Sequence, residues 1–192
     1  MREAPTPAKP EKTVEVVRGQ LHKFMLIPVM PHNATWFDAG TVHFAVEGRV
    51  IGSPDGTVAE RGASIHVFRP DRTEEYLRFD CFEKYPHYHY ILNPDQHNIV
   101  WGYDPVANGP MLDWSLAVIR ARLPDMLRGA GADGLAETVA GHGFDLSVLP
   151  RIEQAMKRAW DQTFPGTDMV QEGFDWYQRW KALHPQFNTV ED

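Results

Sequence analysis

Hydrophobic and polar positions follow two different periods along the chain. Between residues 13 and 104 the pattern is that of strands, and from Thr41 to Ile51 hydrophobic and polar residues alternate, which is typical of a half-buried strand. Further strands are predicted over residues 64–69, 75–82, 85–92 and 97–103. Turn sequences such as Ser53 to Gly56 separate them, because proline and glycine favour turn conformations. Consecutive hairpins of this kind predict an antiparallel meander.

After residue 110 the hydrophobic positions recur every three or four residues, which predicts about three helices. Asp113 is expected to cap the first helix, which Pro124 interrupts. The second is expected to begin at Ser147, with Pro150 in its first turn. The third is predicted from Asp168 to Leu183, before a proline.

Strands followed by helices indicate the α+β class. We expect the meander to curve into a barrel-like sheet, because closure removes exposed sheet edges. Residues 1–12 are proline-rich and charged without a hydrophobic block, which predicts a flexible N-terminal tail. Residues 13–110 then form the sheet region and residues 111–192 the helical region of a single domain.

Composition and charge disfavour several classes of protein. The chain has 26 acidic and 19 basic residues and a net charge of -7, which disfavours binding to nucleic acid. No hydrophobic run approaches the roughly 18 residues of a membrane span, and we expect no secretory signal. Cys81 is the only cysteine, so an internal disulfide is excluded, and its place in a strand predicts a buried, unreactive thiol. We therefore expect a cytoplasmic protein that does not bind membranes.

The segment from Phe79 to Tyr90 has the densest set of chemically active side chains. His87 and His89 are two residues apart on a predicted strand, so both rings leave the same face of the sheet. Two such imidazoles can bind one divalent metal ion, although two ligands alone do not make a site. The alternative is a hairpin with these histidines on its solvated face.

Strand pairing indicates which other side chains can join the histidine pair. If residues 93–96 form the turn, Leu92 faces His97 and Tyr90 faces Ile99. His97 then lies on the opposite side of the sheet from the two histidines.

The neighbouring hairpin places a second polar set on one face. Ile65 and Val67 are expected to face the core, which turns the alternate residues to the other side: His66, Phe68, Tyr76, Arg78 and Asp80. His43 and Glu47 likewise lie opposite a hydrophobic face of their strand. On a flat sheet this face is simply solvated, whereas in a barrel it becomes a lumen and hence a ligand pocket.

In such a lumen, the candidate metal ligands are His87, His89, His66 and Asp80. Nitrogen-rich ligation suits zinc or iron and leaves a position open for water or substrate. Arg78 can bind a substrate carboxylate, the alternative being an ion pair with Asp80 or Glu75. The remaining candidates for substrate binding are His43, Tyr76 and Phe68. The sequence assigns no catalytic residue.

The His87-Tyr88-His89 strand is similar to the first motif of the cupins, a family of metal-binding barrels. The likeness is confined to this strand, since Cys81 stands at the position of a motif glycine, and Asn93 or Pro94 at that of the glutamate. The chain is therefore not assigned to the cupins.

Three hypotheses about function follow. The first is a metal-dependent enzyme, a hydrolase or an oxygenase, acting on a small aromatic or carboxylated substrate. The second is a non-catalytic accessory or assembly subunit that forms a homo-oligomer or joins a larger partner through aromatic side chains such as Trp176 and Trp180. The third is a barrel that carries a small-molecule ligand without turnover.

Overall fold

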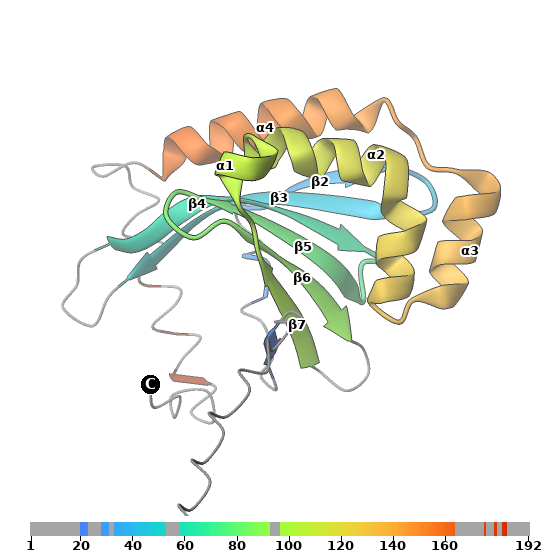
Figure 1. Cartoon of the computed structure of the whole chain (residues 1–192), viewed down its shortest axis with the longest axis horizontal. Helices are drawn as coiled ribbons and strands as arrows, with labels where there is room; N and C mark the ends of the chain where they lie inside the picture. Colours follow the sequence, from blue (N-terminus) through green and yellow to red (C-terminus); the bar gives the residue numbers. More distant parts are fainter. Residues whose placement is uncertain are drawn as a thin grey trace, which may run out of the picture.

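The structure is a computed structural model, which describes residues 20–22, 28–30, 33–52, 58–92, 97–163, 175, 179 and 182–183. A twisted sheet lies beneath a layer of helices, as Figure 1 shows. Its strands are β1 (Gln20–His22), β2 (Thr35–Asp38), β3 (His43–Gly52), β4 (Val58–Phe68), β5 (Glu75–Phe82), β6 (His87–Leu92) and β7 (His97–Gly102).

The sheet is an antiparallel meander in the order β1-β7-β6-β5-β4-β3-β2. Strands β2 to β7 pair with their neighbours in sequence, and β1 pairs with the outer side of β7. In the described part of the chain, β1 and β2 are the two edges and do not pair with each other, so the sheet is open. The predicted barrel is therefore wrong. Closure requires the two edge strands to hydrogen-bond, and here both edges are only three or four residues long.

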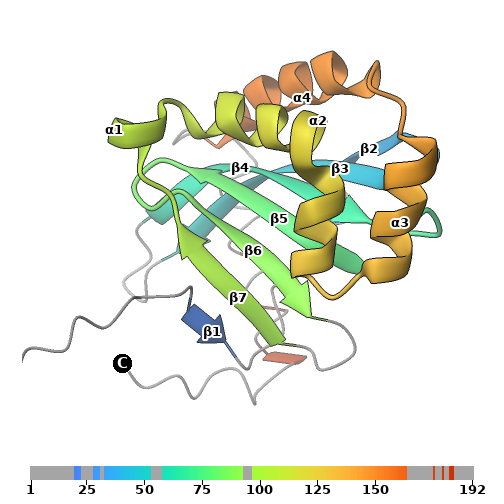
Figure 2. The ribbon, with the colours of Figure 1, turned by 45° about the vertical axis from the view of Figure 1, so that its right-hand side comes forward.

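The helices are α1 (Pro105–Asn108), α2 (Met111–Gly129), α3 (Asp133–His142) and α4 (Val148–Gln162). They cover one face of the sheet, as Figure 2 shows, which confirms the α+β class. Ser147 occupies the N-cap position of α4, as predicted, but its side chain makes no capping hydrogen bond. Helix α2 contains Pro124 and starts earlier than expected, with Pro110 at its N-cap and Asp113 in its first turn. Neither α1 nor α3 was predicted.

Several predicted features lie outside the described residues. These are the tail of residues 1–12, the turn from Ser53 to Gly56 and most of the helix predicted from Asp168 to Leu183. Within the described ranges, no helix has the length and hydrophobicity that crossing a membrane requires.

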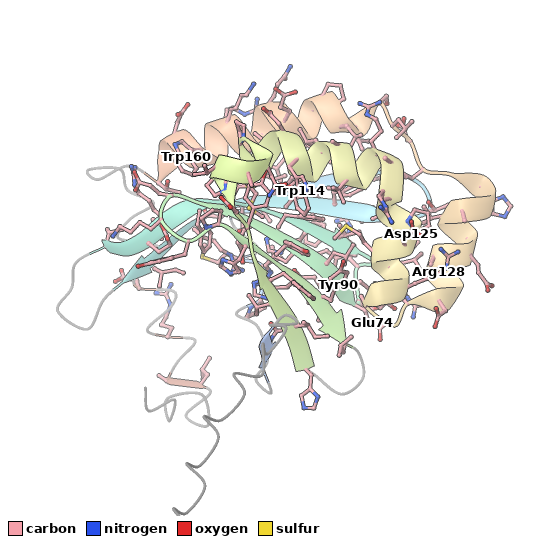
Figure 3. The ribbon with its side chains drawn as sticks, viewed as in Figure 1. Glu74, Tyr90, Trp114, Asp125, Arg128 and Trp160 are labelled. Atoms are coloured by element: carbon pink, nitrogen blue, oxygen red, sulfur yellow. The ribbon has the colours of Figure 1, made fainter. Side chains whose placement is uncertain are left out.

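The hydrophobic core lies between the helices and the sheet. Alternate residues of the central strands point into it, among them Phe44, Ile65, Leu77 and Phe79, and the helices contribute Ile119, Leu123, Leu149 and Ile152. Trp114 of α2 packs at the edge of this layer against the rings of Phe79 and Tyr88 (Figure 3). Each large side chain buried in this way contributes about 1.5–3 kcal/mol.

The opposite face of the sheet, here called the polar face, is also buried. It contains Glu47, Ser64, His66, Arg78, Asp80, His89 and Asn98, each 5% exposed or less. Buried polar groups are stable only when they are hydrogen-bonded or paired, so the polar face must satisfy itself internally. This requirement determines the contacts of the candidate site.

Candidate metal centre

Strand register brings Asp80, His87 and His89 together on the polar face. Asp80 of β5 lies directly opposite His87 of β6, and His89 lies opposite Arg78. Residues opposite and diagonal to one another across an antiparallel pair have touching side chains. The three residues therefore form one cross-strand cluster at the β5–β6 end of the sheet.

The ligand atoms of this cluster converge on a small volume. The Nε2 atoms of His87 and His89 lie 3.3 Å and 3.0 Å from Oδ2 of Asp80. One ligand atom from each residue lies within 4.8 Å of the others, a spacing that can hold a metal ion. Among the sequence candidates, these three are the ones that the structure brings together.

His87 is oriented by the backbone of the turn that precedes it. Its Nδ1 donates a hydrogen bond to the carbonyl oxygen of Tyr85 at 2.7 Å. A carbonyl oxygen can only accept, so Nδ1 carries the proton, and neutral His87 presents the lone pair of Nε2 to Asp80. Metal-bound histidines are usually held in this way, by an oxygen acceptor on the other ring nitrogen.

The other two members of the cluster are held in the same manner. Nδ1 of His89 donates to Oδ1 of Asn98 on β7 at 2.9 Å, which directs Nε2 to Asp80. The second carboxylate oxygen of Asp80 accepts a hydrogen bond from the hydroxyl of Ser64 on β4. Each candidate ligand is therefore positioned by a neighbour, and Nε2 of both histidines and Oδ2 of Asp80 face one another at the centre of the cluster.

Charge and burial perturb all three pKa values. Burial would raise the pKa of Asp80, but His87, His89 and Arg78 hold it well below its usual value. Burial lowers the pKa of His89, and this effect outweighs the attraction of Asp80. Burial alone would also lower the pKa of His87, but its hydrogen bond to Asp80 and the charge of that carboxylate raise it. An ionised carboxylate thus faces at least one neutral imidazole, as a metal site requires.

Access to the cluster runs past His87. The side chain of His87 is 23% exposed, whereas those of Asp80 and His89 are 4% and 6% exposed. The ring of Phe82 packs edge-on against His87, with centroids 5.5 Å apart, and forms one wall of the approach.

His66 is not part of the cluster, although it was predicted as a candidate metal ligand from the sequence. Its Nδ1 lies 2.7 Å from Oε1 of Glu75, and its Nε2 lies 3.3 Å from Oε1 of Glu47. In the register of β4 and β5, His66 lies opposite Arg78, and Ser64 takes the place opposite Asp80.

The guanidinium of Arg78 is bound to Glu75, which was one of the two alternatives for this residue. The pair is two-pronged, and the guanidinium of Arg78 is turned towards Glu75 rather than towards the metal cluster. Burial would lower the pKa of Arg78, but Glu75 raises it.

Tyr76 lies on the side of the core, so its predicted place on the polar face is wrong. The register shifts between Val67 and Phe68, which leaves Tyr76 unpaired as the extra residue of a β-bulge. The bulge reverses the alternation and brings Glu75 to the polar face instead.

The two remaining substrate candidates lie near β2, away from the cluster. Nε2 of His43 is 3.8 Å from Asp38, and the ring of Phe68 packs against that of Trp36. The structure therefore does not gather the predicted substrate-binding residues around the candidate metal ligands.

Sequence reasoning missed Ser64 and Asn98, the neutral residues that orient Asp80 and His89. Their signal is weak, because serine and asparagine in strands seldom indicate a site. Strand register is the available clue, since Ser64 pairs with Asp80 and Asn98 pairs with the residue two after His89.

A cavity of about 350 Å³ lies on the helical side of the sheet, near the same end as the cluster. Most of its wall is hydrophobic, including Phe82, Met111, Leu112, Met156 and Trp160. Cys81 also lines it, and burial raises the pKa of this thiol to about 12. The thiol is therefore neutral and acts as part of the hydrophobic wall, as the sequence predicted.

Comparison with known proteins gives one match. Neither the curated proteins nor the solved structures contain a match to the chain. Residues 36–156, which span β2 to most of α4 and include the whole cluster, match the family described as Domain of unknown function (DUF7700). The chain therefore belongs to this family.

Proposed function

We propose that the protein binds one divalent transition-metal ion at Asp80, His87 and His89 and uses it to act on a small molecule. One observation carries this proposal: two imidazole nitrogens and a carboxylate oxygen converge while the other polar atom of each residue is already bonded. Without a cation or an additional proton, the lone pairs of these atoms repel one another. A metal ion relieves this repulsion.

The charge of the polar face also favours a cation. Among its described residues, the buried or nearly buried carboxylates are Glu47, Glu60, Glu75 and Asp80, and the guanidiniums are Arg49 and Arg78. With the histidines neutral, these groups have a formal charge of -2, and each protonated histidine would offset one of these charges. A divalent cation at the cluster balances that charge inside a region of low dielectric.

The ligand set suits zinc or iron(II). Two histidines and one carboxylate leave further coordination positions for water or substrate. Bound zinc would lower the pKa of a coordinated water, and iron(II) in such a site supports reactions with oxygen. Hydrolysis and oxygenation are therefore the two reaction classes that this set of ligands supports.

Metal analysis of protein purified without a histidine tag, from cells supplied with zinc and iron, tests the proposal. We expect close to one equivalent of metal, lost in a variant with His87→Ala and His89→Ala. His142→Ala, an exposed histidine at the end of α3, is the matched control and should keep the metal. Less than about a tenth of an equivalent in the parent protein would reject metal binding.

The metal found also separates the two reaction classes. Iron together with oxygen uptake on addition of aromatic carboxylic acids supports oxygenation. Zinc together with cleavage of activated esters supports hydrolysis, and both activities should disappear in the double variant.

The cavity on the helical side favours a second candidate, the binding of a small ligand without turnover. Its volume of about 350 Å³ is within the range of small-molecule sites. Three charged residues line it, and two of them are paired, Glu83 with Arg61 and Lys157 with Glu153. The third, Asp161, is exposed. A neutral aromatic ligand therefore fits it better than a charged one.

Thermal unfolding in the presence of indole or naphthalene tests this second candidate. We expect a rise in Tm that Leu112→Trp abolishes, because the larger ring fills the cavity. Leu146→Trp, at an exposed site outside the cavity, should leave the rise intact. Equal shifts in all three proteins would reject a specific ligand site.

The hypothesis of an accessory subunit rests on the sequence alone and stays a proposal. Trp176 and Trp180 lie outside the described residues. Sedimentation velocity over a range of protein concentrations tests it, since a docking subunit should self-associate or bind a partner.

A further inference from the structure

We propose that Glu60 is a positioning residue for the metal centre, because it holds the β5–β6 turn and, through that turn, the ring of His87. This inference rests on the proposed metal binding. It assigns a role to a carboxylate on β4 that is no metal ligand itself.

The side chain of Glu60 binds the turn through backbone N–H groups. Its Oε2 accepts from the amide of Tyr85 at 2.8 Å and from that of Lys84 at 3.1 Å, and its Oε1 lies 3.2 Å from the Lys84 amide. Oε1 also accepts from the amide of Arg61 at 2.8 Å. The backbone N–H groups of three residues are therefore hydrogen-bonded to one carboxylate, and Glu60 is only 6% exposed.

The ring of Tyr85 contributes little to holding the middle of this turn. The side chain of Tyr85 is 73% exposed, so its ring gives almost no packing. The ends of the turn are tied by Glu83 N to Arg61 O and by Tyr103 N to Pro86 O, both at 2.9 Å. Glu60 thus holds the backbone N–H groups of both residues between these ties.

The position of Tyr85 determines the orientation of His87. The carbonyl of Tyr85 accepts the hydrogen bond from Nδ1 of His87, and in the neutral ring this bond leaves Nε2 without a proton. If the turn loses its anchor, the carbonyl can rotate away and both tautomers of His87 become available. Only one of them presents Nε2 to a metal ion beside Asp80.

The chemistry of the anchor requires a carboxylate. Its two oxygens only accept, which matches the three N–H donors around it. In Glu60→Gln one oxygen is replaced by an NH₂ group, which faces donors and cannot accept from them. Glu60→Ala removes the anchor completely and leaves the amides of Lys84 and Tyr85 to water.

Zinc titration against a chromophoric competing chelator tests the inference. We expect Glu60→Ala to weaken zinc binding measurably, with about 10–100-fold as the upper bound, since that is the effect of losing a residue bonded directly to a metal ligand. Glu60→Gln should weaken it by a smaller factor, and it decides the question if Glu60→Ala does not fold. Glu83→Ala, in the same turn but paired with Arg61, is the matched control and should bind zinc like the parent.

Nitrogen-15 NMR of the histidine rings in the metal-free protein gives a second readout, which a general loss of stability would not move. At alkaline pH, where the ring is neutral, we expect the Nδ1–H tautomer of His87 in the parent and in Glu83→Ala, and a mixture of tautomers in the folded Glu60 variants. Folded Glu60 variants with parental zinc affinity and the parental tautomer would overturn the inference. Absence of zinc binding in the parent would refute the proposed function instead, and the tautomer measurement would still decide whether Glu60 positions His87.

Discussion

Arg78 and Glu75 form a two-pronged ion pair inside the polar face of the sheet. Nε of Arg78 donates to Oε1 of Glu75 at 2.8 Å, and Nη2 donates to Oε2 at 2.7 Å. Arg78 is 1% exposed and the side chain of Glu75 is 12% exposed, so neither charge is well hydrated. The stability of the polar face therefore depends on keeping both members of the pair.

Removal of Glu75 should strongly destabilise the protein. Glu75→Ala leaves the guanidinium of Arg78 buried without its main partner, and we expect the free energy of unfolding to fall by about 3–5 kcal/mol. Urea denaturation at neutral pH measures this. Asp125→Ala, which removes an exposed pair with Arg128 on α2 (Figure 3), should change the free energy little. Similar effects of the two substitutions would contradict this account of the polar face.

Glu47 should make the protein sensitive to acid. Burial would raise the pKa of Glu47, but Arg49, His66 and the amide of Met30 lower it to about 2. A carboxyl whose pKa is lower in the folded state stabilises the fold above its unfolded pKa, and this stability is lost as the pH falls from about 4.5 towards 2. The linked free energy is roughly 3 kcal/mol.

Urea denaturation at pH 6 and at pH 3 tests the role of Glu47. Glu47→Gln is expected to be less stable than the parent at pH 6, and the loss of stability between the two pH values should be smaller in this variant. Glu153→Gln, an exposed residue of α4, should show the parental loss. A parental loss in Glu47→Gln would show that other groups cause the acid sensitivity.

Gly62 should tolerate no side chain. A Cβ at this position would lie 2.6 Å from the carbonyl oxygen of Cys81 and 2.7 Å from Cα of Phe82. Because backbone atoms cannot move aside cheaply, Gly62→Ala should cost about 1–3 kcal/mol of stability, and it should displace the Phe82 ring from His87. Thermal unfolding measures the loss. Gly134→Ala in α3, where nothing lies within 4 Å, should instead be neutral or stabilising.

Cys81 should be unreactive in the folded protein. Its side chain is buried against the core, and burial raises the pKa of the thiol to about 12, so the nucleophilic thiolate is scarce at pH 8. Iodoacetamide should modify the native protein much more slowly than the protein in urea, as followed by mass spectrometry. Equal rates would mean that the thiol is open to solvent or acidified, against its position in the structure.

Strand register is the feature that the sequence predicted best. The pairings of Leu92 with His97 and of Tyr90 with Ile99 are confirmed. They could be predicted because two strands joined by a short turn allow few registers, and only one of these keeps the hydrophobic residues on a common face. The same argument placed Asp80 and the histidine pair on strands whose polar residues share a face.

The sequence predictions failed where the alternation of hydrophobic and polar residues breaks, and where the fold depends on pairing between residues far apart in the chain. Tyr76 was misplaced because a one-residue bulge reverses the faces, and no local residue pattern indicates it. Closure of the barrel was predicted because exposed edge strands carry unpaired backbone groups. In the open sheet both edge strands are very short, so few such groups are exposed. Helix α3 was missed because Gly134 and Gly141 lower its intrinsic propensity.

His66 shows that side chains on the same face of a sheet do not necessarily form one site. It shares the polar face with Asp80, but its Nδ1 lies 2.7 Å from Oε1 of Glu75 and its Nε2 lies 3.3 Å from Oε1 of Glu47. The sequence could indicate which side chains share a face, but not which of them lie close enough to share a metal ion. His66 and His89 lie in one row of the sheet, with Arg78 between them.

X-ray absorption at the zinc edge, on tag-free protein loaded with one equivalent of zinc, tests the central claim most directly. The account predicts two imidazole nitrogens at about 2.0–2.1 Å together with oxygen ligands. It also predicts that the imidazole signal is lost in the variant with His87→Ala and His89→Ala. An all-oxygen ligand shell, or an imidazole signal that persists in that variant, would contradict it.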